Sequence, residues 1–524
     1  MKFQPAAFKN INWKDLSSDF SAGLVVFLVA VPLCLGIALA SGAPFSSGLI
    51  AGIIGGLVVP LVSRSQLGVA GPAAGLTAVV LLGIEKIGFF EGFLVAVVIA
   101  GAVQILLGLL RAGSIAYFFP SSVIKGMLSA IGLILILKQL PHALGYDLEN
   151  IASDSFVVGE NENTFTLFYH AFQHIEWGAV IISTVSLLIL IFWSKTPLQK
   201  IRWMPAALVV VVLGVLLNML FEQLSPELSL GTSHLVNLPR INSPADFLAG
   251  FTFPDFSVLA MREVWVVGLT IGIIASIESL LTIEAVDKLD PYKRKSPLNR
   301  ELLAQGLANT IAGLVGGLPV TSVIVRSTAG ISAGAKTRVT AFAHGIFLLL
   351  SVMFLSFYLS LVPMASLAAI LLMVGYKLAK PSIFKAMYSS GWSQFIPFLA
   401  TVVAILLTDL LKGITIGVAI GLSYVIRTNF HSSVNVIRNK KNILIKFNRD
   451  VSFLNKSSLI NILEKIENGS SVLVDGTKAR FIDYDISEIL HEFRKEATLK
   501  NITVEFKNIS TIKSVKTKTN FIEV

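Results

Sequence analysis

Residues 71–75 read Gly-Pro-Ala-Ala-Gly, and the apolar run that follows them lasts only to Gly83. Much later, residues 316–319 read Gly-Gly-Leu-Pro, and another short apolar run follows from Val320 to Gly330. Both runs are too short to cross a ~30 Å hydrocarbon core, which takes about 20 apolar residues. In many transporters, interrupted helices in matching positions of two halves mark the substrate site. The sequence therefore predicts two helices that begin inside a membrane and line a common cavity.

The rest of the chain has the composition of a membrane protein with many spans. Of its 524 residues, 54% are hydrophobic and 14% are charged, and its mean hydropathy is +0.76. Soluble domains carry about 25% charged residues, so most of this surface does not face water. The sole cysteine, Cys34, excludes an intramolecular disulfide. Clear apolar segments are Ala22–Ala40, Gly92–Leu110, Gly178–Trp193 and Ala206–Phe221.

Positive charge alternates between successive loops, and this alternation predicts the orientation in the membrane. Residues 195–202, 288–300 and 377–385 are rich in Lys and Arg, whereas residues 141–175 carry Asp and Glu but no Lys or Arg. Cytoplasmic loops are enriched in Lys and Arg. We therefore expect both termini in the cytoplasm and a plasma membrane of the bacterial inner-membrane type. These loops also account for the net charge of +10, so no nucleic-acid partner is expected.

The two interrupted segments have a similar setting in the two halves. Pro72 and Pro319 are 247 positions apart, and the same offset relates Glu278 to position 31, beside Pro32. We expect Pro32 to break the first span. A helix that begins inside the membrane presents free N–H groups and the positive end of its dipole. Two such ends would form an anion site, with the hydroxyls of Thr77, Thr321 and Ser322 nearby.

Glu278 lies in the apolar run 271–282, where a carboxylate is costly unless it faces a cavity or has a partner. It is a candidate site for a coupling H⁺ or Na⁺. Thr282, four residues on, lies on the same helix face and is a second candidate ligand. The alternative is a structural carboxylate bonded to Ser276, Ser279 or a neighbouring helix.

Arg326 follows the second interrupted segment and would add a full positive charge near a bound anion. The alternative is a residue that merely marks the cytoplasmic end of a short helix.

These motifs resemble the SulP (sulfate permease) family of anion transporters. Ala22–Gly42, with Val31-Pro32-Leu33, and residues 71–74 look like its first and third spans. A more specific likeness lies in residues 275–282, 300–309, 316–321, 326–327 and 333–337, which read Ala-Ser-Ile-Glu-Ser-Leu-Leu-Thr, Arg-Glu-Leu-Leu-Ala-Gln-Gly-Leu-Ala-Asn, Gly-Gly-Leu-Pro-Val-Thr, Arg-Ser and Ala-Gly-Ala-Lys-Thr.

The resemblance implies a polytopic α-helical protein of about fourteen transmembrane helices, arranged as a 7+7 inverted repeat with core and gate domains. It further implies elevator-type alternating access, a homodimer, and substrates such as sulfate, bicarbonate, chloride or dicarboxylates. Glu278 and Thr282 match the coupling-ion position. The implied substrate-binding residues are Pro32, Leu33, Ala73, Ala74, Gly75, Thr77, Ser322, Val323, Ile324, Val325 and Arg326.

The run from Val323 to Val325 departs from the family pattern, which often has small or hydroxylated residues before the arginine. Ala73 and Ala74 likewise lack hydroxyls. The backbone N–H groups must therefore supply more of the binding, and the substrate stays open between sulfate and bicarbonate.

The composition changes after Arg427, where alternating strands and helices predict a small α/β domain. It resembles the STAS domain of SulP proteins. The turn at residues 482–485 shows no obvious phosphorylatable serine, so a dimerisation or folding role is expected. The expected domains are a cytoplasmic segment 1–18, a transporter domain 19–430 and a STAS-like domain 439–524.

We therefore expect a secondary active transporter that moves a small inorganic anion across the lipid bilayer by symport with H⁺ or Na⁺. The alternatives are an uncoupled chloride or anion exchanger, a channel, or a membrane sensor that signals through its STAS domain. No enzyme is expected, because no nucleophile–base pair or metal-ligand spacing is evident. No cofactor or metal site is expected apart from Na⁺ as the coupling ion.

Overall fold

The computed structural model describes residues 13–113, 120–146, 175–196, 204–238, 246, 250–408, 410–431, 434–439, 441–451, 455–479 and 481–509. It divides into two compact units, Met1–Val418 and Ala419–Val524. Most of the expected N-terminal segment 1–18 and of the predicted acidic loop 141–175 lies outside the described residues.

Two series of helices with similar lengths follow one another in the first unit. The first series is α1 (Trp13–Ala40), α2 (Phe45–Val62), α3 (Thr77–Ile87) and α4 (Phe90–Leu109); the second is α10 (Arg262–Leu289), α11 (Leu298–Leu314), α12 (Ile324–Ala333) and α13 (Val339–Leu359). Helices α1 and α10 both have 28 residues, α3 and α12 have 11 and 10, and α4 and α13 have 20 and 21. The starts of α3 and α12 are 247 positions apart, the offset between Pro72 and Pro319.

The prediction of two interrupted segments is confirmed. A three-residue strand, β1 (Ala70–Pro72), and a 3-10 turn, η1 (Ala74–Leu76), precede α3, and strand β2 (Val320–Ser322) precedes α12. The two strands pair antiparallel, with Gly71 opposite Thr321. Equivalent segments of the two series therefore run in opposite directions, as an inverted repeat requires.

The expected break at Pro32 is wrong, because α1 continues as a helix through that residue to Ala40. Helices α2, α12, α13 and α14 (Met364–Leu378) pack along α1. A proline is tolerated inside a membrane helix when neighbouring helices and small local adjustments accommodate the backbone groups it frees.

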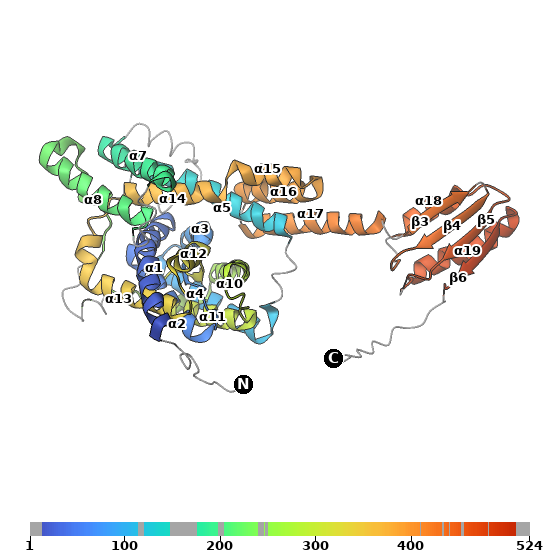
Figure 1. Cartoon of the computed structure of the whole chain (residues 1–524), viewed down its shortest axis with the longest axis horizontal. Helices are drawn as coiled ribbons and strands as arrows, with labels where there is room; N and C mark the ends of the chain where they lie inside the picture. Colours follow the sequence, from blue (N-terminus) through green and yellow to red (C-terminus); the bar gives the residue numbers. More distant parts are fainter. Residues whose placement is uncertain are drawn as a thin grey trace. The chain divides into compact units, whose positions relative to one another are not determined.

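Two groups of helices can be distinguished by their packing, and Figure 1 shows them as a lower and an upper cluster in the first unit. The first group consists of α1–α4 and α10–α13. Its α4 and α11 approach closely, because a Cβ atom on Gly306 would lie 2.7 Å from the Gly101 carbonyl oxygen. Helices α1 and α14 connect the two groups. The second group contains α5 (Ser121–Ala143), α7 (Trp177–Phe192), α8 (Ala206–Leu224), α14, α15 (Pro381–Ser389) and α16 (Trp392–Leu407).

Eight helices in the described part of the chain are long and apolar enough to cross a membrane, and α7 and α16 are shorter apolar helices. The four segments singled out in the sequence coincide with α1, α4, α7 and α8. Helix α17 (Leu410–His431) contains the boundary between the two units. Short 3-10 helices occupy Trp193–Lys195, Pro226–Leu228, Thr232–His234 and Phe256–Ala260.

Beyond α17, the described part of the second unit is a four-stranded sheet, in the order β3-β4-β5-β6, with two helices. The β3–β4 pair is antiparallel and the other two pairs are parallel. Ile445, Phe447, Val474 and Leu490 are buried between sheet and helices. The unit fits a STAS domain, although its sheet begins at Val434 rather than after the expected boundary at residue 439. Its elements are β3 (Val434–Asn439), β4 (Asn442–Phe447), α18 (Lys456–Glu464), β5 (Ser471–Asp475), α19 (Tyr484–Leu499) and β6 (Thr503–Lys507).

Candidate functional site

The starts of α3 and α12 are held together by the β1–β2 pair. The residues that precede the two helical segments, Ala73 and Val323, are both extended, with φ of −118° and −115°. Neither contributes a side-chain cap. The first N–H groups of a helix have no acceptor within it, and they carry the positive end of the helix dipole. Both segments therefore begin with uncapped N–H groups.

Three polar residues of α11 hold β2 in place. Glu301, Gln305 and Asn309 recur every four residues and lie on one buried face of the helix. The Val320 N–H donates to Asn309 Oδ1 at 2.6 Å, and Asn309 Nδ2 donates back to the Val320 carbonyl at 2.9 Å. Asn309 thereby satisfies both backbone groups of Val320, which makes the short strand stable away from water.

The other two α11 residues bind the far end of the same strand. Gln305 Nε2 donates to Ser322 Oγ at 3.0 Å, and the Ser322 hydroxyl donates to Glu301 at 2.7 Å. Ser63 at the end of α2 also donates to Glu301. Sequence reasoning placed these residues in a family motif without a role. Their four-residue spacing in a buried helix is the signal that could have identified one.

Arg326, in the first turn of α12, is fully buried behind β1. Its Nη2 donates to Cys34 Sγ at 3.3 Å and to the Pro72 carbonyl at 3.4 Å. Its Nε and Nη1 have no hydrogen-bond partner among the described residues. A Cβ atom on Gly71 would overlap Arg326 Nη1, so only glycine leaves room for the guanidinium. The guanidinium therefore packs inside the protein against the first interrupted segment.

Glu278, in the middle of α10, reaches the start of the other interrupted segment. A Cβ atom on Gly75 would lie 2.5 Å from Glu278 Oε1, so the carboxyl group packs directly on the backbone of η1. Its Oε2 is buried and has no hydrogen-bond partner in the described part of the chain. Arg326 and Glu278 therefore flank the same five-residue stretch, at Gly71 and at Gly75.

The serines beside Glu278 have other partners. Ser276 donates to the Gly272 carbonyl at 2.6 Å, and Ser279 Oγ accepts from the Ser322 N–H at 3.2 Å. Within α10, which is described throughout, neither serine bonds Glu278. The two serines named in the structural alternative for this carboxylate are therefore engaged elsewhere. Thr282 follows one turn later and is partly buried.

The hydroxyls expected near the anion are largely committed to the protein. Thr77 donates to the Ala74 carbonyl at 2.9 Å, and Ser322 donates to Glu301 at 2.7 Å. Thr321 is fully buried and directs its hydroxyl at the Ser322 carbonyl, 3.5 Å away. The residues nearest the two helix starts are thus apolar, and Ile324 and Val325 are 37% and 45% exposed.

The structure places the predicted site residues on α1 and at the two helix starts. Ala73, Ala74 and Gly75 lie at the α3 start, and residues 323–326 at the α12 start. Pro32 and Leu33 are buried in α1, and Leu33 belongs to an apolar cluster with Val210 of α8 and Leu367 of α14. Leu33 therefore lies where the two helix groups meet, one residue before Cys34, which contacts Arg326.

His344 is a buried polar residue of α13. It is fully buried, and neither ring nitrogen has a hydrogen-bond partner among the described residues. Its helix also places Leu348 beside Cys34, as the surroundings of Gly52 show. No group of three or more His, Cys, Asp or Glu that could hold a metal ion occurs in the described part of the chain.

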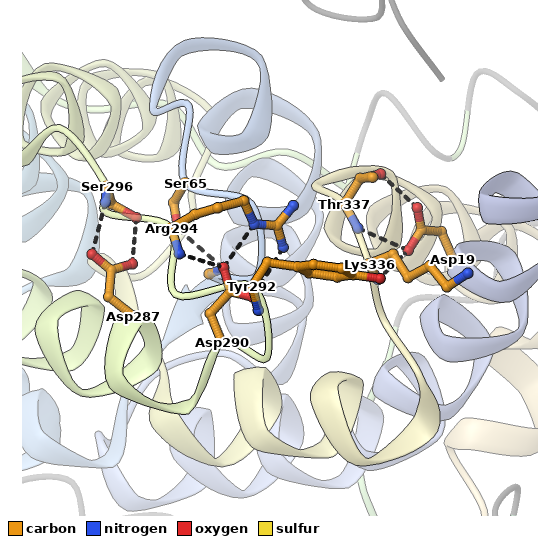
Figure 2. A network of polar contacts seen from close by, with 10 residues as sticks. Asp19, Ser65, Asp287, Asp290, Tyr292, Arg294, Ser296, Lys336 and Thr337 are labelled. Carbon is orange, nitrogen blue, oxygen red and sulfur yellow. Dashed lines mark hydrogen bonds and ion pairs between the residues drawn. The ribbon is translucent and has the colours of Figure 1, made fainter. Parts of the chain in front are cut away.

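A second polar network, which sequence reasoning missed, joins the ends of α1 and α10 to nearby loops (Figure 2). Asp19 of α1 is buried and accepts from the backbone N–H groups of Lys336 and Thr337, at 2.7 and 3.0 Å. After α10, Asp290 accepts from Arg294 Nε at 2.7 Å. These carboxylates anchor the loops before α11 and α13 to the helices that carry the site.

Residues 16–423 match the sequence model of the sulfate permease family. This chain belongs to the sulfate permease family. It is 28% identical over 424 residues to the Bacillus subtilis protein named "Putative sulfate transporter YvdB", covering 80% of this chain and 75% of that protein. It is 27% identical over 421 residues to the bicarbonate transporter BicA of Picosynechococcus sp., covering 78% and 70%.

Solved structures share the fold. The transmembrane domain of a cyanobacterial bicarbonate transporter BicA matches with a TM-score of 0.65 at 23% identity, covering 77% of this chain and 98% of that one. The overall structure of SLC26A9 matches with a TM-score of 0.78 at 15% identity, covering 96% and 86%. The predicted family and the helical fold with a C-terminal α/β part are confirmed. The chain is an integral membrane protein of a transporter family and not an enzyme.

Proposed function

We propose that this protein is a secondary active transporter of a small inorganic anion, sulfate or bicarbonate, coupled to H⁺ or Na⁺. The proposal rests on the two interrupted helices, whose preceding strands β1 and β2 pair with each other. Arg326 and Glu278 contact the stretch before α3, at Gly71 and at Gly75. Relatives named as sulfate and bicarbonate transporters support the anion class.

The anion binds between the starts of α3 and α12. Backbone N–H groups at a helix start point toward the bound ion, and each helix end contributes roughly half a positive charge. Arg326 adds a full charge from behind β1, where it is held by Cys34 and Pro72. The anion is released readily, because most of its ligands carry partial charges.

The coupling ion binds at Glu278, with Thr282 as a second ligand. The carboxyl group lies against η1 and lacks a bond to Ser276 or Ser279, so it is available to a cation or proton. A cation there adds positive charge beside the anion and tightens its binding. By linkage, the anion tightens cation binding by the same factor.

Alternating access follows from movement of the group α1–α4 and α10–α13 against the second helix group, as in an elevator. The separate packing of the two groups supports this motion. We further propose that the protein forms a homodimer in a bacterial inner membrane with both termini in the cytoplasm.

Uptake of labelled sulfate and bicarbonate into proteoliposomes, with and without Na⁺ or H⁺ gradients, tests the proposal. We expect saturable uptake that a gradient accelerates, and we expect Glu278→Gln to lose only the acceleration. Glu284→Gln, on the same helix and paired with the exposed Lys288, is the matched control. Equal gradient-driven uptake by Glu278→Gln contradicts coupling at this residue, and a conductance without saturation indicates a channel.

A further inference from the structure

We infer that the anion carried at this site is singly charged, so that bicarbonate or another monoanion is accepted and sulfate is rejected. The inference rests on the proposed function and concerns the same site. It follows from which groups can donate to the anion and from the charges fixed around it.

Side-chain donors are already used at both helix starts. In α12, Ser327 Oγ donates to the Val323 carbonyl and Thr328 Oγ1 to the Ile324 carbonyl, each at 2.9 Å. Thr77 donates to the Ala74 carbonyl. Each hydroxyl satisfies its own helix backbone, so it has no second proton to offer a ligand. The remaining donors are the backbone N–H groups of the two helix starts and the unpartnered Nε and Nη1 of Arg326 behind β1.

The side chains around these N–H groups are apolar. Ala73, Val323, Ile324 and Val325 carry no donor, and the last two are the exposed residues of the α12 start. An anion that enters must exchange its hydration shell for a few backbone N–H groups and the positive ends of two helix dipoles. That exchange costs more for a doubly charged ion, because the desolvation cost of an ion rises steeply with its charge.

The fixed charges also favour a single negative charge. Within β1, η1, β2 and the first turns of α3 and α12, all of which are described, Arg326 is the sole charged residue. Two carboxyl groups adjoin the same segments, Glu278 at Gly75 and Glu301 at Ser322. With a cation or proton on Glu278, the charge of Arg326 offsets that of Glu301. The two helix starts contribute roughly half a positive charge each, so together they balance one negative charge of the substrate. A dianion would leave a further negative charge uncompensated inside the membrane, beside Glu301.

The full-length protein in proteoliposomes tests the inference directly. Uptake of radiolabelled bicarbonate, chloride and sulfate is measured at equal concentrations, and unlabelled sulfate is added as a competitor. We expect at least one monoanion to be transported at about ten times the sulfate rate or more. We also expect excess sulfate to leave monoanion uptake unchanged.

Sulfate uptake equal to or faster than monoanion uptake, or full competition by sulfate, would overturn the inference while leaving anion transport intact. Absence of uptake for every anion would instead overturn the proposed function. The two failures are therefore distinguishable.

A charge variant gives an independent measurement. Val325→Lys adds one positive charge at the exposed start of α12, and Val325→Met adds similar length without charge. We expect sulfate to inhibit monoanion uptake, or to bind in a thermal-shift assay, in the Lys variant only. An unchanged sulfate response in a folded Val325→Lys protein would contradict the role assigned to charge.

Discussion

Gly71 and Gly75 are the two ends of a five-residue stretch that contacts Arg326 at one end and Glu278 at the other. Each glycine is required by a side chain that packs where a Cβ atom would otherwise stand. The guanidinium and the carboxyl group thereby act on one short backbone segment from two sides. At a range of a few ångströms in a medium of low dielectric constant, such charges influence a bound ion strongly.

Gly71→Ala is expected to reduce anion uptake severely, because the new Cβ atom would displace the Arg326 guanidinium, which is fully buried. The measurement is the half-saturating anion concentration and the maximal rate in proteoliposomes. Gly231→Ala is a suitable control, since a Cβ atom there would meet no atom closer than 3.8 Å. Normal uptake by a folded Gly71→Ala protein would show that the position of Arg326 is unimportant.

Asp290 lies just beyond α10 and should make stability depend on pH. Burial raises the pKa of its carboxyl, but hydrogen bonds from Arg294 and from the Tyr292 N–H outweigh this effect and lower the pKa. Since the folded pKa lies below the unfolded value of about 3.9, the stabilisation is present above that pH and is lost as pH falls through the folded pKa.

We expect Asp290→Asn to cost about 1.5–3 kcal/mol at pH 7, the usual value of hydrogen bonds to a charged group. The difference in melting temperature from the wild type should shrink as the pH falls below about 4. Thermal unfolding of the detergent-solubilised protein across this range checks the expectation. The control is Glu284→Gln, at a partly exposed carboxylate that pairs with the exposed Lys288. A difference that does not depend on pH would exclude an electrostatic origin.

At the scale of elements, α11 acts as the support for β2. Its three polar residues bind the strand from Val320 to Ser322, and the strand in turn pairs with β1. Interrupted backbone inside a membrane is stable only if its polar groups find partners within the protein. Helix α11 supplies those partners and so determines where both interrupted helices begin.

Asn309→Leu should therefore destabilise the protein by about 2–4 kcal/mol, because it leaves the buried N–H and carbonyl of Val320 without side-chain partners. Anion binding should weaken together with stability. Thr310→Val is the matched control, since Thr310 only bonds the Gly306 carbonyl of its own helix. A melting temperature equal to that of the control would show that β2 does not depend on this amide.

At the scale of the molecule, every candidate site residue belongs to the first unit, Met1–Val418. The second unit has its own sheet and its own core, including Ile445, Val474 and Leu490. Binding of the anion and of the coupling ion should consequently be a property of the first unit alone.

A chain truncated after His431 keeps α17 whole and lacks the sheet. We expect the purified, folded truncation to bind and transport the same anions as the full chain, measured by uptake in proteoliposomes. Size-exclusion chromatography establishes that it is folded. Loss of anion selectivity in the folded truncation would assign the second unit a direct role in transport.

The sequence alone was sufficient for the membrane class, the family and the two interrupted helices, and it singled out Glu278 and Arg326 as site candidates. Those features depend on local composition and on spacing along the chain, which the sequence records directly. The α/β class of the C-terminal unit was likewise recognisable from the sequence, whereas the edge strand β3 was not, because its exposed pattern carries little hydrophobic signal.

The tertiary structure decided what these residues touch. Pro32 leaves α1 unbroken because neighbouring helices hold it, and the hydroxyls of Thr77 and Ser322 bond the protein. The support of β2 by Asn309, and the packing of Glu278 on Gly75, join residues far apart in sequence. Such contacts depend on how the helices pack, which a single sequence does not reveal. They place the guanidinium of Arg326 and the carboxyl group of Glu278 at the two ends of one short segment, Gly71 to Gly75.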